Sequence, residues 1–295
     1  MTRPLRVALV GLGKIARDQH LPAMAASPDF ECVAVVDPAL PEVPQPCFAT
    51  VEALLTSEVA FDAAVLCQPP QARFAAASRF LQTGHHVLLE KPPGSSLAEL
   101  DLLRHLASQR GCTLYCAWHS RHAPAVEPAL RWLDGRLLQS VSVVWKEDVR
   151  VWHPGQQWIW DAGGFGVFDP GINALSIVTR WLQGPMRVLD GLLSFPQNRD
   201  APVSADLRLE TPAGVPVSAQ FDWLHPGPAL WDIQVVTTAG TLRLREGGAR
   251  LDIDGTEVPV GPVREYPSLY AEFPACVRAG NRDADDAPLR IVTDA

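Results

Sequence analysis

The chain has 295 residues, of which 47% are hydrophobic and 20% charged, and a formal net charge of −8. This length favours two domains over a single core, and the negative charge disfavours nucleic acids and anionic membranes as partners. The sequence has no apolar run long enough to span a membrane, its start is typical of a strand rather than a signal peptide, and its six cysteines lack a metal-ligand spacing. We therefore expect a cytoplasmic protein with reduced thiols.

A glycine-rich turn follows the first predicted strand. Residues 5–10 are mostly apolar, and the next six, GLGKIA, match the pattern G-x-G-x-x-A at the start of a predicted helix. The first glycine allows a tight turn, the second lets the backbone approach a pyrophosphate, and the amides at the helix start are available to bind it. We therefore expect Gly11, Gly13, Lys14 and Ile15 to bind a dinucleotide cofactor.

An acidic residue follows the second predicted strand, residues 31–36. Asp37 stands where dinucleotide-binding folds place the carboxylate that binds the ribose hydroxyls. Such a carboxylate repels a 2′-phosphate, so we expect NAD to be preferred over NADP, although a nearby cation such as Arg17 would soften this preference. The alternative is that Asp37 is an ordinary turn residue before Pro38.

The alternation of strands and helices continues to residue 118. Strands are expected at 61–67, 86–90 and 113–118, and helices at 72–82 and 97–109. This order predicts an α/β fold with a doubly wound parallel sheet, the Rossmann type, in which ligands bind beyond the carboxyl ends of the strands.

Polar residues follow two of these strands. Gln68 and Pro69 come after one strand, and Glu90 and Lys91 lie at the end of the next, so all four are expected to line the cofactor site. Lys91 is also a candidate catalytic residue, because Glu90 flanks it and Pro92 restricts the backbone beside it. The alternative is a solvated lysine at the end of a strand.

The pattern changes after residue 122. A helix is expected at 126–133, a strand at 138–145 and a last helix at 273–279. Further strands separated by turn signals are expected at 188–194, 205–210, 215–223, 230–238, 240–245 and 250–254. They predict an α+β domain with a mainly antiparallel sheet that carries a helix on one face. The expected domains are thus 1–121, binding NAD or NADP, and 122–295, binding the substrate, with the last residues able to pack back on the first domain.

Residues 145–180 have the composition of a ligand pocket. They contain four of the nine tryptophans and five glycines, together with His153 and several acidic residues. Large aromatic rings beside a few polar groups are typical of a small-molecule site. The stretch also contains a predicted helix start, with Asp169 as the cap, Pro170 in the first turn and Asn173 on the same face as Asp169. We expect the chemistry at Asp169 and Asn173, together with a lysine from elsewhere in the chain.

These motifs together resemble the Gfo/Idh/MocA family of nicotinamide-dependent oxidoreductases, and the likeness covers nearly the whole chain. The motifs that carry it are GLGKIARDQHLPA from Gly11, EKPPG from Glu90, WHSR from Trp118 and FDPGINAL from Phe168. The stretch WKEDVRVWHPGQQWIW is more specific, and it is similar to the aldose 1-dehydrogenases that oxidise L-arabinose and D-galactose. The resemblance implies a Rossmann domain, a second domain built on an open antiparallel sheet, and a homo-oligomer.

The resemblance also implies a reaction, in which a hydride leaves C1 of a pyranose for NAD(P)+ and a lactone is formed. Lys91 and Asp169, with Asn173, would then frame the reacting carbon. The family helix often reads D-x-G-x-H-x-x-D, but this chain has Asn173 at the histidine position and Ser176 at the last. An amide does not take up a proton at neutral pH, so the base is Lys91 or Asp169, and both assignments stay open.

Sugar chemistry suggests roles for further residues. A pyranose has an apolar face that stacks on indole rings and a rim of hydroxyls that polar groups can bind. The stacking candidates are Trp152 and, more weakly, Trp231, although a core role is about as common for a tryptophan. The hydroxyl-binding candidates are His119, Glu147, His153 and Asn173. No metal is expected, because hydride transfer to nicotinamide needs none.

Two alternatives to this function remain. In the first, the chain is a family member that acts on another polyol or aldose. In the second, it is a sensor of sugar or NAD that has no catalytic activity. The presence of both Lys91 and Asp169 favours an enzyme, because a sensor has no need of that pair. The sequence does not rank L-arabinose against D-galactose.

Overall fold

The computed structural model describes residues 3–182, 184–281 and 284–295. Residues 1, 2, 183, 282 and 283, which belong to the two expected domains, lie outside the described part of the chain. The chain divides into two compact units, each described here by itself. The first comprises Met1–Ala117 and Tyr266–Asp286, and the second comprises Trp118–Glu265 and Ala287–Ala295.

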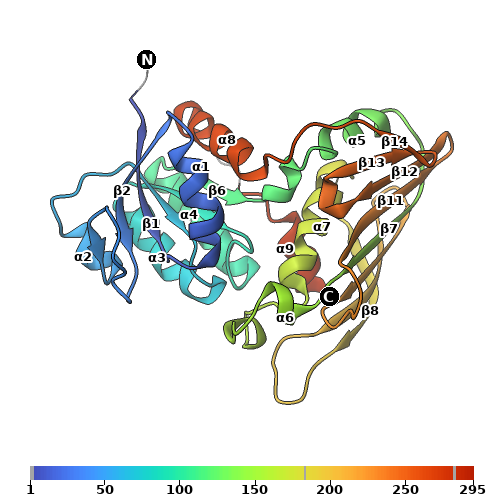
Figure 1. The fold of residues 1–295 in the computed structure, drawn as a ribbon, viewed down its shortest axis with the longest axis horizontal. Helices are drawn as coiled ribbons and strands as arrows, with labels where there is room; N and C mark the ends of the chain where they lie inside the picture. The colour runs from blue at the N-terminus through green and yellow to red at the C-terminus, as the bar shows by residue number, and fades with distance from the viewer. Residues whose placement is uncertain (1–2, 183, 282–283) are drawn as a thin grey trace. The chain divides into compact units, whose positions relative to one another are not determined.

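The first unit is built on a six-stranded parallel sheet in the order β3-β2-β1-β4-β5-β6 (Figure 1). Its strands are β1 (Leu5–Val10), β2 (Phe30–Val36), β3 (Cys47–Phe48), β4 (Ala63–Leu66), β5 (His86–Glu90) and β6 (Leu114–Ala117). Its helices are the π-helical turn η1 (Ala16–His20), α1 (Leu21–Ala25), α2 (Val51–Leu55), α3 (Pro70–Gln82), α4 (Leu97–Arg110) and α8 (Glu265–Ala279), whose first residue belongs to the second unit. This strand order reverses between β1 and β4, as in dinucleotide-binding folds, and it confirms the predicted doubly wound sheet.

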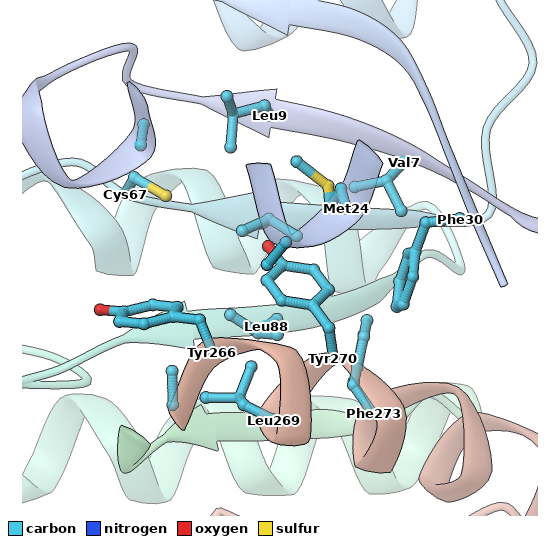
Figure 2. Close-up of a cluster of buried hydrophobic side chains, with 14 of the residues drawn as sticks. Val7, Leu9, Met24, Phe30, Cys67, Leu88, Tyr266, Leu269, Tyr270 and Phe273 are labelled. Carbon is cyan, nitrogen blue, oxygen red and sulfur yellow. The ribbon is translucent and has the colours of Figure 1, made fainter. Parts of the chain in front are cut away.

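Helix α8 belongs to the core of the first unit, from Tyr266 onward. Tyr266, Tyr270 and Phe273 recur at helical spacing and pack with sheet residues such as Val7 and Leu88 (Figure 2). One apolar face of the helix thus covers the sheet. The helix expected at 273–279 begins earlier, at Glu265. Pro267 is compatible with this start, because a residue in the first turn of a helix needs no hydrogen bond from its nitrogen.

The second unit contains an eight-stranded sheet in the order β14-β13-β12-β11-β7-β10-β9-β8 (Figure 1). Its strands are β7 (Leu138–Lys146), β8 (Arg187–Ser194), β9 (Ser204–Glu210), β10 (Pro216–Asp222), β11 (Leu230–Thr237), β12 (Gly240–Arg245), β13 (Arg250–Ile253) and β14 (Thr256–Val258). All neighbours are antiparallel except β7 and β10, which are parallel, so the predicted mainly antiparallel sheet is confirmed.

One face of this second sheet is covered by helix. The helical segments are the 3₁₀ turns η2 (His119–His122), η3 (Trp158–Trp160) and η4 (Glu246–Gly248), and helices α5 (Val126–Leu133), α6 (Val149–Trp152), α7 (Phe168–Trp181) and α9 (Ala287–Asp294). Side chains along β9 and β10 alternate between buried and exposed, so the opposite face is open. A Cβ atom on Gly171 of α7 would lie 2.9 Å from the Phe221 ring, so glycine is what allows the helix to approach β10 closely.

The compact units divide the chain differently from the ranges 1–121 and 122–295. They separate at Ala117, and residues 266–286 return to the first unit. The reason is the apolar face of α8, which is buried against the parallel sheet. None of the described helices is long and apolar enough to cross a membrane.

Candidate active site

The glycine turn of the first unit is shaped for a ligand. Gly11 has a φ of +86°, and a Cβ there would lie 2.9 Å from the backbone nitrogen of Gln68, so only glycine fits. A Cβ on Gly13 would meet no atom of the described residues within 4 Å, which leaves this stretch of backbone open to approach. Lys14, which pairs with Asp18, and Ile15 complete the turn before η1.

Asp37 is fixed at the carboxyl end of β2. Its Oδ2 accepts a hydrogen bond from the amide of Leu12 at 2.8 Å, and its Oδ1 accepts one from Ala39 at 2.9 Å. A carboxylate has about four lone-pair sites, so both oxygens retain capacity for a ribose diol. Arg17 donates to the carbonyl of Leu12 at 3.1 Å, so its guanidinium lies on the same glycine turn.

The ends of β4 and β5 bring further polar groups to the carboxyl edge of the sheet. Gln68 is followed by Pro69, the N-cap of α3, and its Oε1 is buried without a hydrogen-bond partner among the described residues. Such an atom ordinarily finds a partner in water or a ligand. Lys91 follows β5 and is joined to Pro92 by a cis peptide bond, while the Arg73 guanidinium donates to the carbonyls of Glu90 and Pro92.

These features of the first unit fit a nicotinamide dinucleotide. The turn at Gly11 and Gly13 suits the pyrophosphate, Asp37 suits the adenosine ribose, and the orphaned oxygen of Gln68 offers an acceptor. The side chain of Glu90 lies within the core of the first unit. Its carboxylate is 1% exposed and accepts a hydrogen bond from Tyr266 within the core.

In the second unit, Asp169 lies in the first turn of α7 and is buried. The helix begins at Phe168 after Val167, so the expectation that Asp169 caps it is wrong. The glycine before it explains the shift, because the amide of Asp169 donates to the carbonyl of Gly166 at 2.9 Å and the turn closes earlier. A carboxylate in the first turn of a helix is stabilised by the helix dipole. Asn173 lies one turn further along α7 and is half-buried.

An imidazole lies between two buried carboxylates. The Nε2 atom of His153 is 3.7 Å from Oδ2 of Asp169 and 3.9 Å from Oε1 of Glu147, and its Nδ1 lies 3.3 Å from Oε1 of Gln156. Three of the predicted site residues in the second unit thus lie close together in the structure. We call Glu147, His153 and Asp169 the acid–imidazole cluster.

Two indoles hold Glu147 in place. Its Oε1 accepts a hydrogen bond from Nε1 of Trp223 at 3.0 Å, and its Oε2 accepts one from Nε1 of Trp231 at 2.8 Å. The Trp152 ring lies 5.0 Å from that of Trp231 and is 47% exposed, so it offers a face to a ligand. Trp223 packs against His153 and was not singled out by the sequence analysis. The signal that could have found it is the expected strand at 215–223, in which every second residue, including Phe221 and Trp223, is apolar.

The WHSR turn is fixed against α7. Arg121 donates to the carbonyl of Ser176 at 3.0 Å, and the Nδ1 atom of His119 bonds to the Glu265 carboxylate. A carboxylate on Nδ1 orients an imidazole and sets which nitrogen faces outward. Glu265 was missed because 146 residues separate it from His119. Within the described part of the chain, no group of three or more His, Cys, Asp or Glu side chains is arranged to hold a metal ion.

The doubly wound sheet and the polar groups at its carboxyl edge define a protein that binds a dinucleotide cofactor. Comparison with known proteins agrees, because the family model described as "Oxidoreductase family, NAD-binding Rossmann fold" matches residues 5–117. The chain is 44% identical to galactose 1-dehydrogenase of Pseudomonas fluorescens, an alignment that covers 99% of this chain and 95% of the relative. The chain belongs to the Gfo/Idh/MocA family of oxidoreductases.

Solved structures agree with this assignment. The crystal structure of D-galactose-1-dehydrogenase from Rhizobium etli superposes with a TM-score of 0.95 at 50% identity, covering 100% of this chain and 95% of that one. The WlbA dehydrogenase from Bordetella pertussis, solved with NADH and UDP-GlcNAcA, superposes with a TM-score of 0.86 over 99% of this chain and 95% of that one. At 20% identity, the second likeness shows the shared fold alone.

Proposed function

We propose that the chain is an aldose 1-dehydrogenase, which oxidises C1 of D-galactose, L-arabinose or both to the lactone by hydride transfer to NAD+ or NADP+. The observation that carries the proposal is the 44% identity to a galactose 1-dehydrogenase along nearly the whole chain. The acid–imidazole cluster beside an exposed indole supports it, because it combines hydroxyl-binding groups with an apolar platform.

The second unit supplies the proposed sugar-binding groups. Trp152 stacks on the apolar face of the pyranose, and Trp231 supports it through their ring contact. The proposed hydroxyl-binding groups are His119, Glu147, His153 and Asn173. Each oxygen of Glu147 accepts an indole hydrogen bond, which fixes the carboxylate close to the tryptophan that supports Trp152.

The proposed chemistry separates a hydride from a proton. A nicotinamide dinucleotide held by the glycine turn and Asp37 would supply the hydride acceptor for C1, and the proton on the C1 oxygen passes to a base as the lactone carbonyl forms. We propose Lys91 as this base, with Asp169 accepting a hydrogen bond from the same hydroxyl. In the alternative assignment Asp169 takes the proton and a charged Lys91 stabilises the developing negative charge on oxygen.

The proposed specificity follows from the substrates. D-Galactose and L-arabinose share the configuration at C2, C3 and C4, so a pocket that binds these hydroxyls accepts both. A single CH2OH group in such a pocket changes binding by about 1–3 kcal/mol, which is a modest preference. For the cofactor, the fixed carboxylate of Asp37 favours NAD over NADP.

The direct test is turnover with both cofactors. The protein is mixed with NAD+ or NADP+ and a panel of D-galactose, L-arabinose, D-glucose and myo-inositol, and reduced nicotinamide is followed by absorbance. We expect reduction with the first two sugars and a lactone that hydroxylamine traps. Reduction only with inositol or another sugar points to a different family substrate, and sugar binding without reduction points to a sensor.

We also propose a homo-oligomer formed through the second unit. Its sheet has an open face, and the edge strand β8 exposes the large apolar side chains of Leu189 and Leu192. Exposed apolar patches commonly mark contact surfaces. Light scattering after gel filtration measures the mass, and a monomer at micromolar concentration would refute this proposal.

A further inference from the structure

A buried network of ionisable side chains is attached to the lysine-bearing turn of the first unit. Oε1 of Glu90, the residue before Lys91, accepts a hydrogen bond from the Tyr266 hydroxyl at 2.5 Å and lies 3.3 Å from Nε2 of His20. All three network side chains are buried. The proposed reaction uses none of them, so their presence needs another explanation.

The network joins three segments that are distant in sequence. Glu90 is the last residue of β5, His20 is the last residue of η1 behind the glycine turn, and Tyr266 and Tyr270 come from α8. The Tyr270 hydroxyl lies 2.8 Å from Nδ1 of His20. Figure 2 shows both tyrosine rings rising from α8 among the apolar side chains of the sheet.

A buried carboxylate at this position is costly unless its environment compensates it. Removing such a group from water costs several kcal/mol, which hydrogen bonds and a nearby cation must offset. A leucine in place of Glu90 would fill the same core without that cost. The compensation here is directional, because Tyr266 donates to one defined oxygen of the side chain.

The network and Arg73 together constrain the residues on both sides of Lys91. The side chain of Glu90 is bonded to Tyr266, and the carbonyls of Glu90 and Pro92 both accept from the Arg73 guanidinium. The backbone at Lys91 is thus anchored before and after the lysine. A displacement of the end of β5 would be transmitted directly to the Lys91 amine.

We infer that Glu90 and Tyr266 are positioning residues for Lys91, and that their buried hydrogen bond keeps the lysine amine where the reaction needs it. This inference rests on the proposed role of Lys91 in sugar oxidation. Tyr266 acts through Glu90 and the end of β5, and touches neither substrate nor cofactor in this mechanism. Tyr270, which bonds to His20, contributes to the stability of the same network.

The test compares Tyr266→Phe with Tyr270→Phe. Each variant removes one buried hydroxyl from the same helix, so both are expected to lower the melting temperature. We expect Tyr266→Phe to reduce kcat for D-galactose about tenfold, which is less than the ~100-fold that a 1 Å misplacement can cause. Its KM and NAD+ affinity should change less than threefold. Tyr270→Phe should keep kcat within twofold, and an equal loss of kcat in both variants would overturn the inference.

A second readout does not depend on turnover. The chain contains only three lysines, Lys14, Lys91 and Lys146, so reductive methylation with ¹³C-formaldehyde gives a resolvable set of NMR signals, and Lys91→Arg identifies one of them. We expect Tyr266→Phe to change the chemical shift of the Lys91 signal, while the other two signals serve as references. An unchanged Lys91 signal overturns the positioning role. If the wild-type chain oxidises no sugar but the Lys91 signal moves, the proposed function fails and the positioning role stands.

Discussion

Replacing Glu147 by glutamine tests whether its carboxylate organises the tryptophans of the second unit. In the structure, one oxygen accepts from Trp223 at 3.0 Å and the other from Trp231 at 2.8 Å. A glutamine has one oxygen and one NH2 group, so it can accept a hydrogen bond from only one indole. The other indole N–H then faces a second donor at a position that is 4% exposed.

The magnitude follows from the unpaired donor. A buried donor that loses its acceptor costs about 1–3 kcal/mol. In a domain of 150–250 residues each kcal/mol lowers the melting temperature by about 2–4 °C, so Glu147→Gln should melt roughly 2–12 °C below the wild type. The KM for D-galactose should rise as well, because the ring of Trp231 supports that of Trp152.

The melting temperature of Glu147→Gln is measured by calorimetry and compared with that of a control variant, Glu127→Gln. Glu127 pairs with Arg180 at 2.6 Å on an exposed helix surface, and such pairs contribute at most about 1 kcal/mol. We expect this control to melt within about 4 °C of the wild type. If the two variants melt together and the KM for sugar is unchanged, the two indole bonds do not organise the cluster.

Three further predictions concern the first unit. Lys91→Ala should lower kcat by about 100-fold or more while NAD+ affinity stays within a few-fold, since a general base contributes ~10²–10⁴; a change in affinity alone would make Lys91 a cofactor ligand. Asp37→Ser should narrow the ratio of kcat/KM for NAD+ over NADP+, and an unchanged ratio would contradict the ribose assignment. Burial lowers the pKa of His20, but Cys67 and Glu90 outweigh burial and raise it to about 9. Because an unfolded histidine titrates near ~6.5, this stabilisation is complete below that pH and is lost as the pH rises through about 9. Thermal unfolding across this range should show the loss in the wild type and not in His20→Gln, and parallel curves would refute it.

The parts of the fold that depend on local pattern were predictable from sequence. The glycine turn and Asp37 follow from the strand–turn–helix order alone. The alternation of apolar and polar residues along β9 and β10 predicted strands of an antiparallel sheet with one buried face. The parallel pairing of β7 with β10 was not predictable, because it depends on which strands meet in space. The same holds for the bond from Tyr266 to Glu90, whose partners are 176 residues apart.

The start of α7 shows a different limit. The sequence favoured Asp169 as the cap because aspartate before proline is a common helix start. The backbone instead turns at Gly166, which adopts a φ of +53°, and the helix begins two residues earlier than that pattern indicates. Asp169 is consequently a buried residue inside the first turn, and its Oδ2 lies 3.7 Å from Nε2 of His153.

The position of that histidine bears on the proton transfer. Asn173 takes the place of the helix histidine in the pattern of the family, so the sequence of α7 itself supplies no imidazole beside Asp169. In the structure, His153 reaches Asp169 from the segment after α6, with Nε2 at 3.7 Å from Oδ2. Three ionisable side chains, Glu147, His153 and Asp169, therefore lie close together in the second unit. A pH profile of sugar oxidation alone therefore does not separate Asp169 from Lys91 as the base, whereas the Lys91 resonance reports on the amine directly.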